Sequence, residues 1–240
     1  MMYQIPKLFP QSTTSNPVIC VQGLGSTKEY SVLITDTIPD LGFNAGCQCF
    51  PLYWYDDSTV DIADLFNQYA DEDVLDRYDR KDGVTDYILK EARKLYGSKV
   101  KKEDIFYYVY GFLHSPEYKC TFASDLKKSL PRLPLVDSPE DFWAFSKAGR
   151  ELAELHLNYE TVEPYQGVEF DVKPVSGYSV EKMRFGKKDS KTADKSTIIF
   201  NCGLTIKNIP LEAYDYVVNG KSAIEWVMER YQITTDSKSG

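Results

Sequence analysis

The chain has 240 residues, is 42% apolar and carries a formal net charge of −8 at pH 7. This length suits one large domain or two small ones, with enough apolar residues for a buried core. No run of about 18 apolar residues occurs, which excludes an ordinary membrane span. The N-terminal segment lacks the basic and apolar regions of a signal peptide, so we expect a cytoplasmic protein.

The negative charge is concentrated in residues 56–86, which hold eleven acidic side chains against Arg77, Arg80 and Lys81. The rest of the chain is therefore neutral overall. We interpret the acidic run as a solvated face. An acidic total argues against a free-standing nucleic-acid binder, but it permits a local basic surface.

Five cysteines are scattered along the chain, and their odd number is typical of a reduced protein rather than of a disulfide framework. Cys47 and Cys49 form the only close pair in the sequence, without a second pair or a nearby histidine. Structural zinc sites need four ligands. The sequence therefore predicts no metal site, and no cofactor motif is present.

The N-terminal part of the chain is predicted to be an arm followed by strands. Residues 1–16 show no periodic pattern and are expected to form the arm. Residues 18–21 and 30–35 predict a β-hairpin, and residues 49–55 predict a further strand. The glycines at 23–25 favour a plain turn over a nucleotide loop, because neither a GxGxxG pattern nor a Walker lysine accompanies them.

The middle of the chain has helical spacing. Residues 61–69 and 84–95 each predict a helix, and Gly97 is placed to end the second one. The stretch 104–114 is nearly all apolar and predicts a central helix that ends before Pro116. Ser115 can then cap a helix that continues through Leu126.

Another helix is predicted to begin at Ser138-Pro139, and strands follow it. Alternation in residues 178–185 and 195–201 predicts two strands around a polar loop, and residues 204–206 predict a third. Helices are expected from Pro210 and over 222–231.

These elements predict an α+β fold with a helical centre flanked by mixed or antiparallel β-sheet segments. We expect strands at 18–55 and 162–206 to share one sheet. The predicted organisation is an arm over 1–16 and one domain over 17–240, with a helical subregion at 61–160 and a β-rich one at 162–240.

Two groups of basic residues are candidates for contacts with DNA. The first surrounds the predicted C-terminal hairpin, where Met183 and Phe185 would point inward and the basic residues outward. It consists of Lys182, Arg184, Lys187, Lys188, Lys191 and Lys195. The second lies around the helical centre and consists of Lys127, Lys128, Arg132 and Arg150. The alternative interpretation is a solvated hairpin tip for the first group and solvated helix faces for the second.

Motifs for catalysis are missing. The sequence contains no P-loop, no DEAD-like motif, no amino-methyltransferase motif and no nucleophile motif. His114 ends one predicted helix, where we expect it to bond to carbonyl groups of the helix end. His156 lies on the apolar face of another helix, where we expect a hydrogen-bonded core histidine. The sequence therefore predicts no catalytic residue.

Six blocks, in this order along the chain, carry a resemblance to a known family. They are YSVLITDTIPDL, QCFPLYWY, EDIFYYVYGFLHSPEY, FASDLKKSLPRLPL, FWAFSKAGRELAELHLNYE and IPLEAYDYVVNGKSAIEWVMERYQ. Together they resemble the C-terminal specificity region of Type ISP restriction–modification enzymes, which are often labelled putative DEAD/DEAH-box helicases. The resemblance runs from about Pro17 to Gly240.

In that family one long polypeptide carries a nuclease, a translocase motor, a coupler, an adenine-N6 methyltransferase and, last, a target-recognition domain. The resemblance implies a non-catalytic domain that reads a short duplex sequence. Its expected partners are double-stranded DNA and the upstream domains of the same polypeptide, with no membrane. The alternative is an interaction or structural module that docks onto the methyltransferase while DNA is read elsewhere. An independent enzyme is poorly supported.

Overall fold

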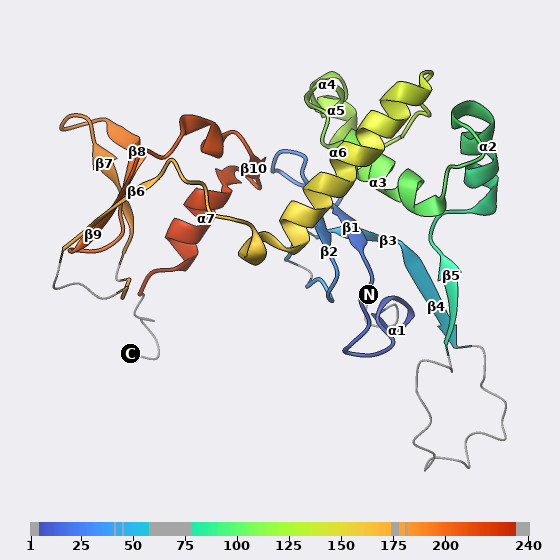
Figure 1. The fold of residues 1–240 in the computed structure, drawn as a ribbon, viewed down its shortest axis with the longest axis horizontal. Coiled ribbons are helices and arrows are strands. Elements are labelled where there is room, and N and C mark those ends of the chain that lie inside the picture. The colour runs from blue at the N-terminus through green and yellow to red at the C-terminus, as the bar shows by residue number, and fades with distance from the viewer. Residues whose placement is uncertain are drawn as a thin grey trace, which may run out of the picture. The chain divides into compact units, whose positions relative to one another are not determined.

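The computed structural model describes residues 5–40, 42–44, 46–57, 78–173, 178–180 and 182–233. The chain divides into two compact units, Met1–Val162 and Glu163–Gly240, each with its own hydrophobic core (Figure 1). The helix expected over residues 61–69 falls outside the described residues. No helix among the described residues is long and apolar enough to cross a membrane.

The first unit contains a three-stranded antiparallel sheet with β1 (Val18–Val21) in the centre (Figure 1). β1 pairs with β2 (Val32–Thr35) on one side and with β3 (Gln48–Pro51) on the other. The expected hairpin of the first two strands is confirmed. Because side chains alternate along a strand, Ile19 and Val21 pack toward the helices, whereas Val18 and Cys20 face the opposite side.

The strand expected over 49–55 is broken at Leu52. The Leu52 amide donates to the Pro17 carbonyl at 2.8 Å, and its carbonyl accepts from the Gly83 amide at 2.7 Å. The chain then continues as β4 (Tyr53–Asp57), which pairs with β5 (Tyr78–Asp82) in a separate two-stranded sheet. α1 (Ile5–Leu8) precedes the buried Asn16, whose side-chain amide donates to the carbonyls of Leu8 and Tyr53 and so ties this segment to β4.

Two long helices form the centre of the first unit. α3 (Lys102–Leu113) and α6 (Pro139–Leu157) cross at Gly111 and Gly149 (Figure 1). A Cβ atom on Gly149 would lie 1.9 Å from the Tyr107 carbonyl oxygen, and one on Gly111 would lie 2.3 Å from the Phe145 carbonyl oxygen. The absence of side chains at both glycines therefore permits the backbones to meet. The central helix and its end before Pro116 are confirmed.

Shorter helices complete this unit. α2 (Asp86–Tyr96) begins at the Thr85 cap and ends at Gly97, whose φ of 101° is a left-handed value that favours glycine. Tyr96 stacks on Phe142 with ring centroids 4.2 Å apart, which joins α2 to α6. The expected caps at the serines preceding α4 and α6 are confirmed. The helix expected through residue 126 is instead two pieces, α4 (Pro116–Thr121) and α5 (Ala123–Leu126).

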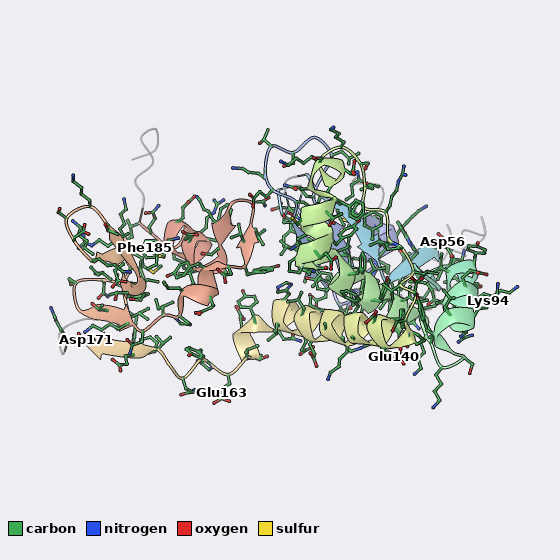
Figure 2. All side chains as sticks on the ribbon, turned by 90° about the horizontal axis from the view of Figure 1, so that it is seen from above. Asp56, Lys94, Glu140, Glu163, Asp171 and Phe185 are labelled. Atoms are coloured by element: carbon green, nitrogen blue, oxygen red, sulfur yellow. The ribbon has the colours of Figure 1, made fainter. Side chains whose placement is uncertain are left out.

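The second unit contains a four-stranded antiparallel sheet in the order β6-β9-β8-β7. Its strands are β6 (Glu169–Val172), β7 (Arg184–Lys187), β8 (Ala193–Ile199) and β9 (Leu204–Lys207). Asp171 and Phe185 lie on its two edge strands (Figure 2). The remaining elements are η4 (Tyr159–Thr161), which belongs to the first unit, and η5 (Leu211–Tyr214), β10 (Val217–Val218), β11 (Lys221–Ser222) and α7 (Ala223–Arg230), which belong to the second.

The α+β class is confirmed, but the expectation of one shared sheet is wrong. Among the described residues, the strands of 18–57 and those of 169–207 belong to different sheets in different units. Each group has a hydrophobic cluster of its own, so neither needs the other to bury its apolar face. The strand expected over 178–185 is also shorter, because β7 begins only at Arg184, and the helix expected at Pro210 is the 3-10 turn η5.

Candidate nucleic-acid interface

The basic hairpin of the sequence is formed by β7 and β8 and ends in an ordered turn. Lys187 pairs with Ala193, and the Lys188 amide donates to the Thr192 carbonyl at 3.0 Å. At the tip, the Asp189 carboxylate accepts from the amides of Lys191 and Thr192 at 2.7 and 2.8 Å. These two backbone donors lower the pKa of Asp189 below its usual value. The turn is therefore held by its own aspartate.

The two faces of the hairpin differ in character. Met183 is buried and Phe185 is half-buried, and both pack in the core of the second unit, in line with the expected inward direction. Lys182 and Arg184 are exposed. Arg184 lies directly opposite Ile199 in the register, on the face away from the core.

Five basic residues of the hairpin region are exposed, and none of the ion pairs found among the described residues involves them. They are Lys182, Arg184, Lys187, Lys188 and Lys191. Lys188 nevertheless interacts electrostatically with Asp194, whose pKa is lowered mainly by its hydrogen bond to Ser196. The group provides exposed positive charge on a ribbon anchored by its inner side chains.

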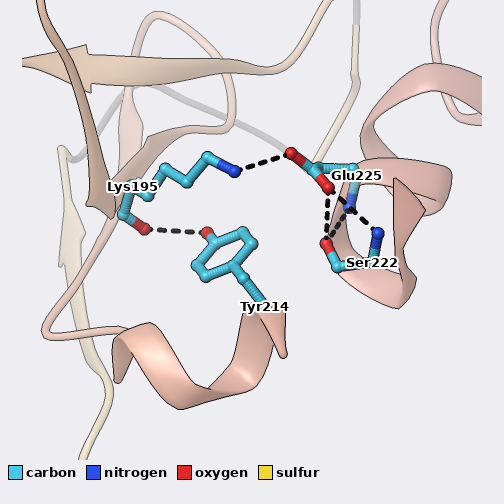
Figure 3. Close-up of polar contacts among 4 residues, drawn as sticks. All are labelled: Lys195, Tyr214, Ser222 and Glu225. Atoms are coloured by element: carbon cyan, nitrogen blue, oxygen red, sulfur yellow. Dashed lines mark hydrogen bonds and ion pairs between the residues drawn. The ribbon is translucent and has the colours of Figure 1, made fainter. Parts of the chain in front are cut away.

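Lys195, the sixth residue of the group, has partners within the chain. Its ammonium forms a 2.9 Å ion pair with Glu225 and lies 4.9 Å from the centre of the Tyr214 ring (Figure 3). Glu225 also accepts from the amide and hydroxyl of Ser222 at the start of α7. Its bond to Lys195, followed by the bond from the Ser222 amide, lowers the pKa of Glu225 to about 2. Lys195 is therefore better placed to tie β8 to α7 than to contact a ligand.

The second basic group also contains both exposed residues and a residue with partners within the chain. Lys127, Lys128 and Arg132 are exposed at the end of α5 and in the segment after it. Arg150, in contrast, forms a 3.2 Å ion pair with Asp104, and its guanidinium lies 4.2 Å from the centre of the Tyr107 ring. Arg150 thus braces α6 against α3. A cavity of about 620 Å³ adjoins Arg132. It is lined mainly by apolar side chains, among them Phe112, Tyr118, Phe122 and Leu133.

Both histidines lie in the first unit and bond to neighbouring groups, as expected from the sequence. His114 Nδ1 is 2.8 Å from the Tyr110 carbonyl, and its Nε2 is 3.2 Å from the Val32 carbonyl. The Tyr110 hydroxyl lies 2.5 Å from His156 Nδ1. Burial lowers the pKa of His114 to about 4 and lowers the pKa of His156 as well.

The comparisons with known proteins decide the family. The model of the Type ISP C-terminal specificity domain matches residues 1–240. The chain belongs to this family. None of the curated proteins searched matches the sequence.

Solved structures resemble this specificity domain over nearly its whole length. The ATP-dependent Type ISP restriction–modification enzyme LlaBIII bound to DNA is 37% identical, with a TM-score of 0.80 over 100% of the chain. A nuclease-deletion mutant of the Type ISP enzyme LlaGI with a DNA substrate mimic is 33% identical, with a TM-score of 0.71 over 99%. A DrdV–DNA complex is 30% identical, with a TM-score of 0.79 over 98%. The chain spans only 14%, 16% and 22% of those three chains, respectively.

Two features of the specificity domain were missed in the sequence. An apolar groove of about 780 Å³ lies between the sheet of the second unit and α7, with Tyr165, Tyr178 and Tyr231 exposed at its lining. The spacing of apolar residues in α7 signals the helix, but not that its face stays partly uncovered. In the first unit, Cys20 joins Cys47 and Cys49 in one cluster. Only the strand register could have indicated this, because 26 residues separate Cys20 from the pair.

Proposed function

We propose that this specificity domain recognises a short duplex DNA sequence for a larger restriction–modification polypeptide, and that the β7–β8 hairpin is its reading element. The observation that carries the proposal is the set of five exposed basic residues on a ribbon anchored by Met183 and Phe185; within the part of the chain that the structure describes, none of the five forms an ion pair. A two-stranded ribbon fits the major groove of B-DNA.

The residues of the hairpin would have different roles. Arg184 stands on the outer face of β7, where its guanidinium can donate two parallel bonds to one guanine. Lys182 lies two residues before it and is also exposed, although it borders a pocket that Phe185 and Glu225 line as well. Lys187, Lys188 and Lys191 surround the tip, and their ammonium groups would bind phosphates, which supplies affinity without sequence information.

The family supports this proposal and suggests the partners. The three solved relatives are described as bound to DNA or to a DNA substrate mimic. Because they are much longer than this chain, we infer that catalysis by the parent enzyme resides in other parts of the polypeptide and that this domain is itself non-catalytic. The parent's methyltransferase, translocase and nuclease are then its covalent partners, and a cytoplasmic location stays a prediction.

The direct test is a gel-shift or anisotropy titration of the 240-residue chain with labelled duplex DNA. We expect binding at low salt that weakens linearly on a plot of log affinity against log salt, because bound phosphates release counterions. If the folded chain does not bind any duplex at low salt, the proposal that this domain reads DNA by itself is contradicted.

The apolar groove favours a second role, docking onto another part of the parent polypeptide. Its lining is almost entirely apolar and includes the exposed side chains of Tyr165, Tyr178, Val227 and Tyr231. Exposed apolar surface of this kind is typical of protein interfaces. Docking and DNA reading use different surfaces of the second unit, so a Val227→Asp substitution should disturb docking while leaving duplex binding by the isolated chain unchanged.

A further inference from the structure

Three cysteine side chains meet on one face of the sheet in the first unit. Cys20 on the central strand β1 lies directly opposite Cys49 on β3. Cys47 precedes Cys49 by two positions and so points to the same side of the chain. This face is the one turned away from α3 and α6, and it is covered by Leu8 and Phe9 from the segment around α1.

The distances between the sulfur atoms fit a common ligand. Cys49 Sγ lies 3.9 Å from Cys20 Sγ and 3.9 Å from Cys47 Sγ, and all three sulfur atoms lie within 4.8 Å of one another. Sulfur ligands about 2.3 Å from a zinc ion stand about 3.8 Å apart when the bond angles are tetrahedral. An ion could therefore be bound with only small movements of the side chains.

We propose that Cys20, Cys47 and Cys49 form a binding site for one thiophilic metal ion of the Zn²⁺ type. Soft thiolate ligands select zinc and similar metals over the hard ions that prefer oxygen. Among the described residues, no histidine or carboxylate joins the cluster, so the protein supplies three ligands and leaves a fourth position open. Cys49 is the partly exposed member, and water can supply the fourth ligand from its side.

Binding is an exchange of protons for the ion. Each of the three thiols loses its S–H proton to the buffer as a metal–sulfur bond forms, and no electron is transferred. The bound ion would fasten the beginning of β3 to the middle of β1. The site lies in a different unit from the basic hairpin.

The alternative to a metal site is three cysteines that act as small apolar side chains. Free cysteine is often buried in this role. A disulfide between Cys20 and Cys49, which are direct partners across the strands, would also remove two of the ligands. The first alternative predicts that the reduced, folded chain does not bind a thiophilic ion with defined stoichiometry, whereas the disulfide would prevent binding only until the chain is reduced.

The experiment uses the 240-residue chain with Cys120→Ser and Cys202→Ser. Both of these cysteines are exposed, and their replacement leaves the cluster as the only source of thiols. The reduced protein is titrated with Co²⁺, whose thiolate charge-transfer and d–d absorption bands report sulfur ligation. We expect the bands to saturate at one Co²⁺ per chain, to disappear when Zn²⁺ is added, and the melting temperature to rise on zinc binding.

The matched variant adds Cys49→Ser to the same background. It should lose the charge-transfer bands and the zinc-dependent rise in melting temperature. The proposal is overturned if the folded parent, with three titratable thiols, shows no such bands, or if the Cys49→Ser chain binds Co²⁺ as the parent does. Should the Cys49→Ser chain fail to fold, the titration of the parent still decides the question by itself.

Discussion

Lys195 on β8 and Glu225 on α7 form a 2.9 Å ion pair, and Glu225 at the same time accepts from the Ser222 amide and hydroxyl (Figure 3). The Tyr214 hydroxyl donates to the Lys195 carbonyl at 2.7 Å. One carboxylate therefore caps the last helix and fastens it to the basic hairpin. Lys195 takes part in the support of this hairpin, while the basic residues nearer its tip remain available.

The first prediction separates the two roles of Glu225. Glu225→Gln keeps an oxygen for the Ser222 donors but removes the charge opposite Lys195, so we expect a loss of less than about 1 kcal/mol in the free energy of unfolding. Glu225→Ala removes both interactions and should cost about 1–2 kcal/mol. Urea denaturation of both variants checks the ranking, and equal effects would show that only one of the two interactions stabilises the domain.

The second prediction concerns the crossing of α3 and α6. In an exposed helix, glycine to alanine is stabilising by about 1 kcal/mol. At Gly149 the added Cβ would lie 1.9 Å from the Tyr107 carbonyl oxygen, so we expect Gly149→Ala to destabilise the chain by about 1–3 kcal/mol. A decrease in the free energy of unfolding would show that close packing dominates at Gly149, whereas an increase would show that helix propensity does. Ala148→Ser, at an exposed position of the same helix, should change stability by less than about 0.5 kcal/mol.

The third prediction is a loss of stability in mild acid. Burial lowers the pKa of His114 from 6.5 to about 4. Between these two pH values, His114 is therefore protonated in the unfolded chain but neutral in the folded chain. The stability should therefore be complete above pH 6.5 and fall toward pH 4, by up to about 1.4 kcal/mol per pH unit for this residue. His156, whose pKa is also lowered by burial, changes stability in the same direction.

The control for this prediction is His114→Gln. A neutral imidazole can donate to only one of the two carbonyls it faces, those of Tyr110 and Val32, and glutamine retains a donor without a titrating ring. The variant should be less stable than the parent at pH 7. Its free energy of unfolding should nevertheless decrease less than that of the parent between pH 7 and pH 5. If its loss over that interval equals that of the parent, His114 is not the group responsible.

Local signals in the sequence predicted local structure well. Ser115 and Ser138 cap their helices, Pro116 marks the end of the central helix, and Gly97 ends α2, because each effect depends only on neighbours in the chain. The direction of Met183 followed from strand alternation in the same way. Such features need no knowledge of the tertiary fold.

Pairings between distant segments could not be predicted. Leu52 ends one strand because its backbone bonds to Pro17 and Gly83, which are far from it in sequence. The strands of 18–57 and those of 169–207 belong to different sheets, and nothing in their alternation specifies a partner. Arg150 was a candidate for DNA contact because it is basic, yet Asp104, 46 residues away, is its ion-pair partner.

The fourth prediction tests the lysines at the tip of the hairpin. Lys187→Ala with Lys188→Ala should weaken binding to all duplexes alike and reduce the salt slope by about one for each ammonium group that no longer binds a phosphate. Lys90→Ala with Lys99→Ala is a matched control, because it removes the same charge from exposed positions of the first unit. The same decrease in affinity in both double variants would assign the effect to net charge rather than to the tip.

The last prediction is that Arg184 determines part of the DNA sequence that the domain selects. We compare the parent chain, Arg184→Lys and Arg184→Ala by selecting bound duplexes from a random pool. Lysine keeps the positive charge but not the planar fork that binds one guanine by two bonds, so Arg184→Lys should retain most of the affinity and relax the preference at one base pair by about 1–3 kcal/mol. Arg184→Ala should lose the same preference and also bind more weakly. If both variants select the same sequences as the parent, the hairpin is a solvated tip, and the reading surface must be sought around the exposed Lys127, Lys128 and Arg132.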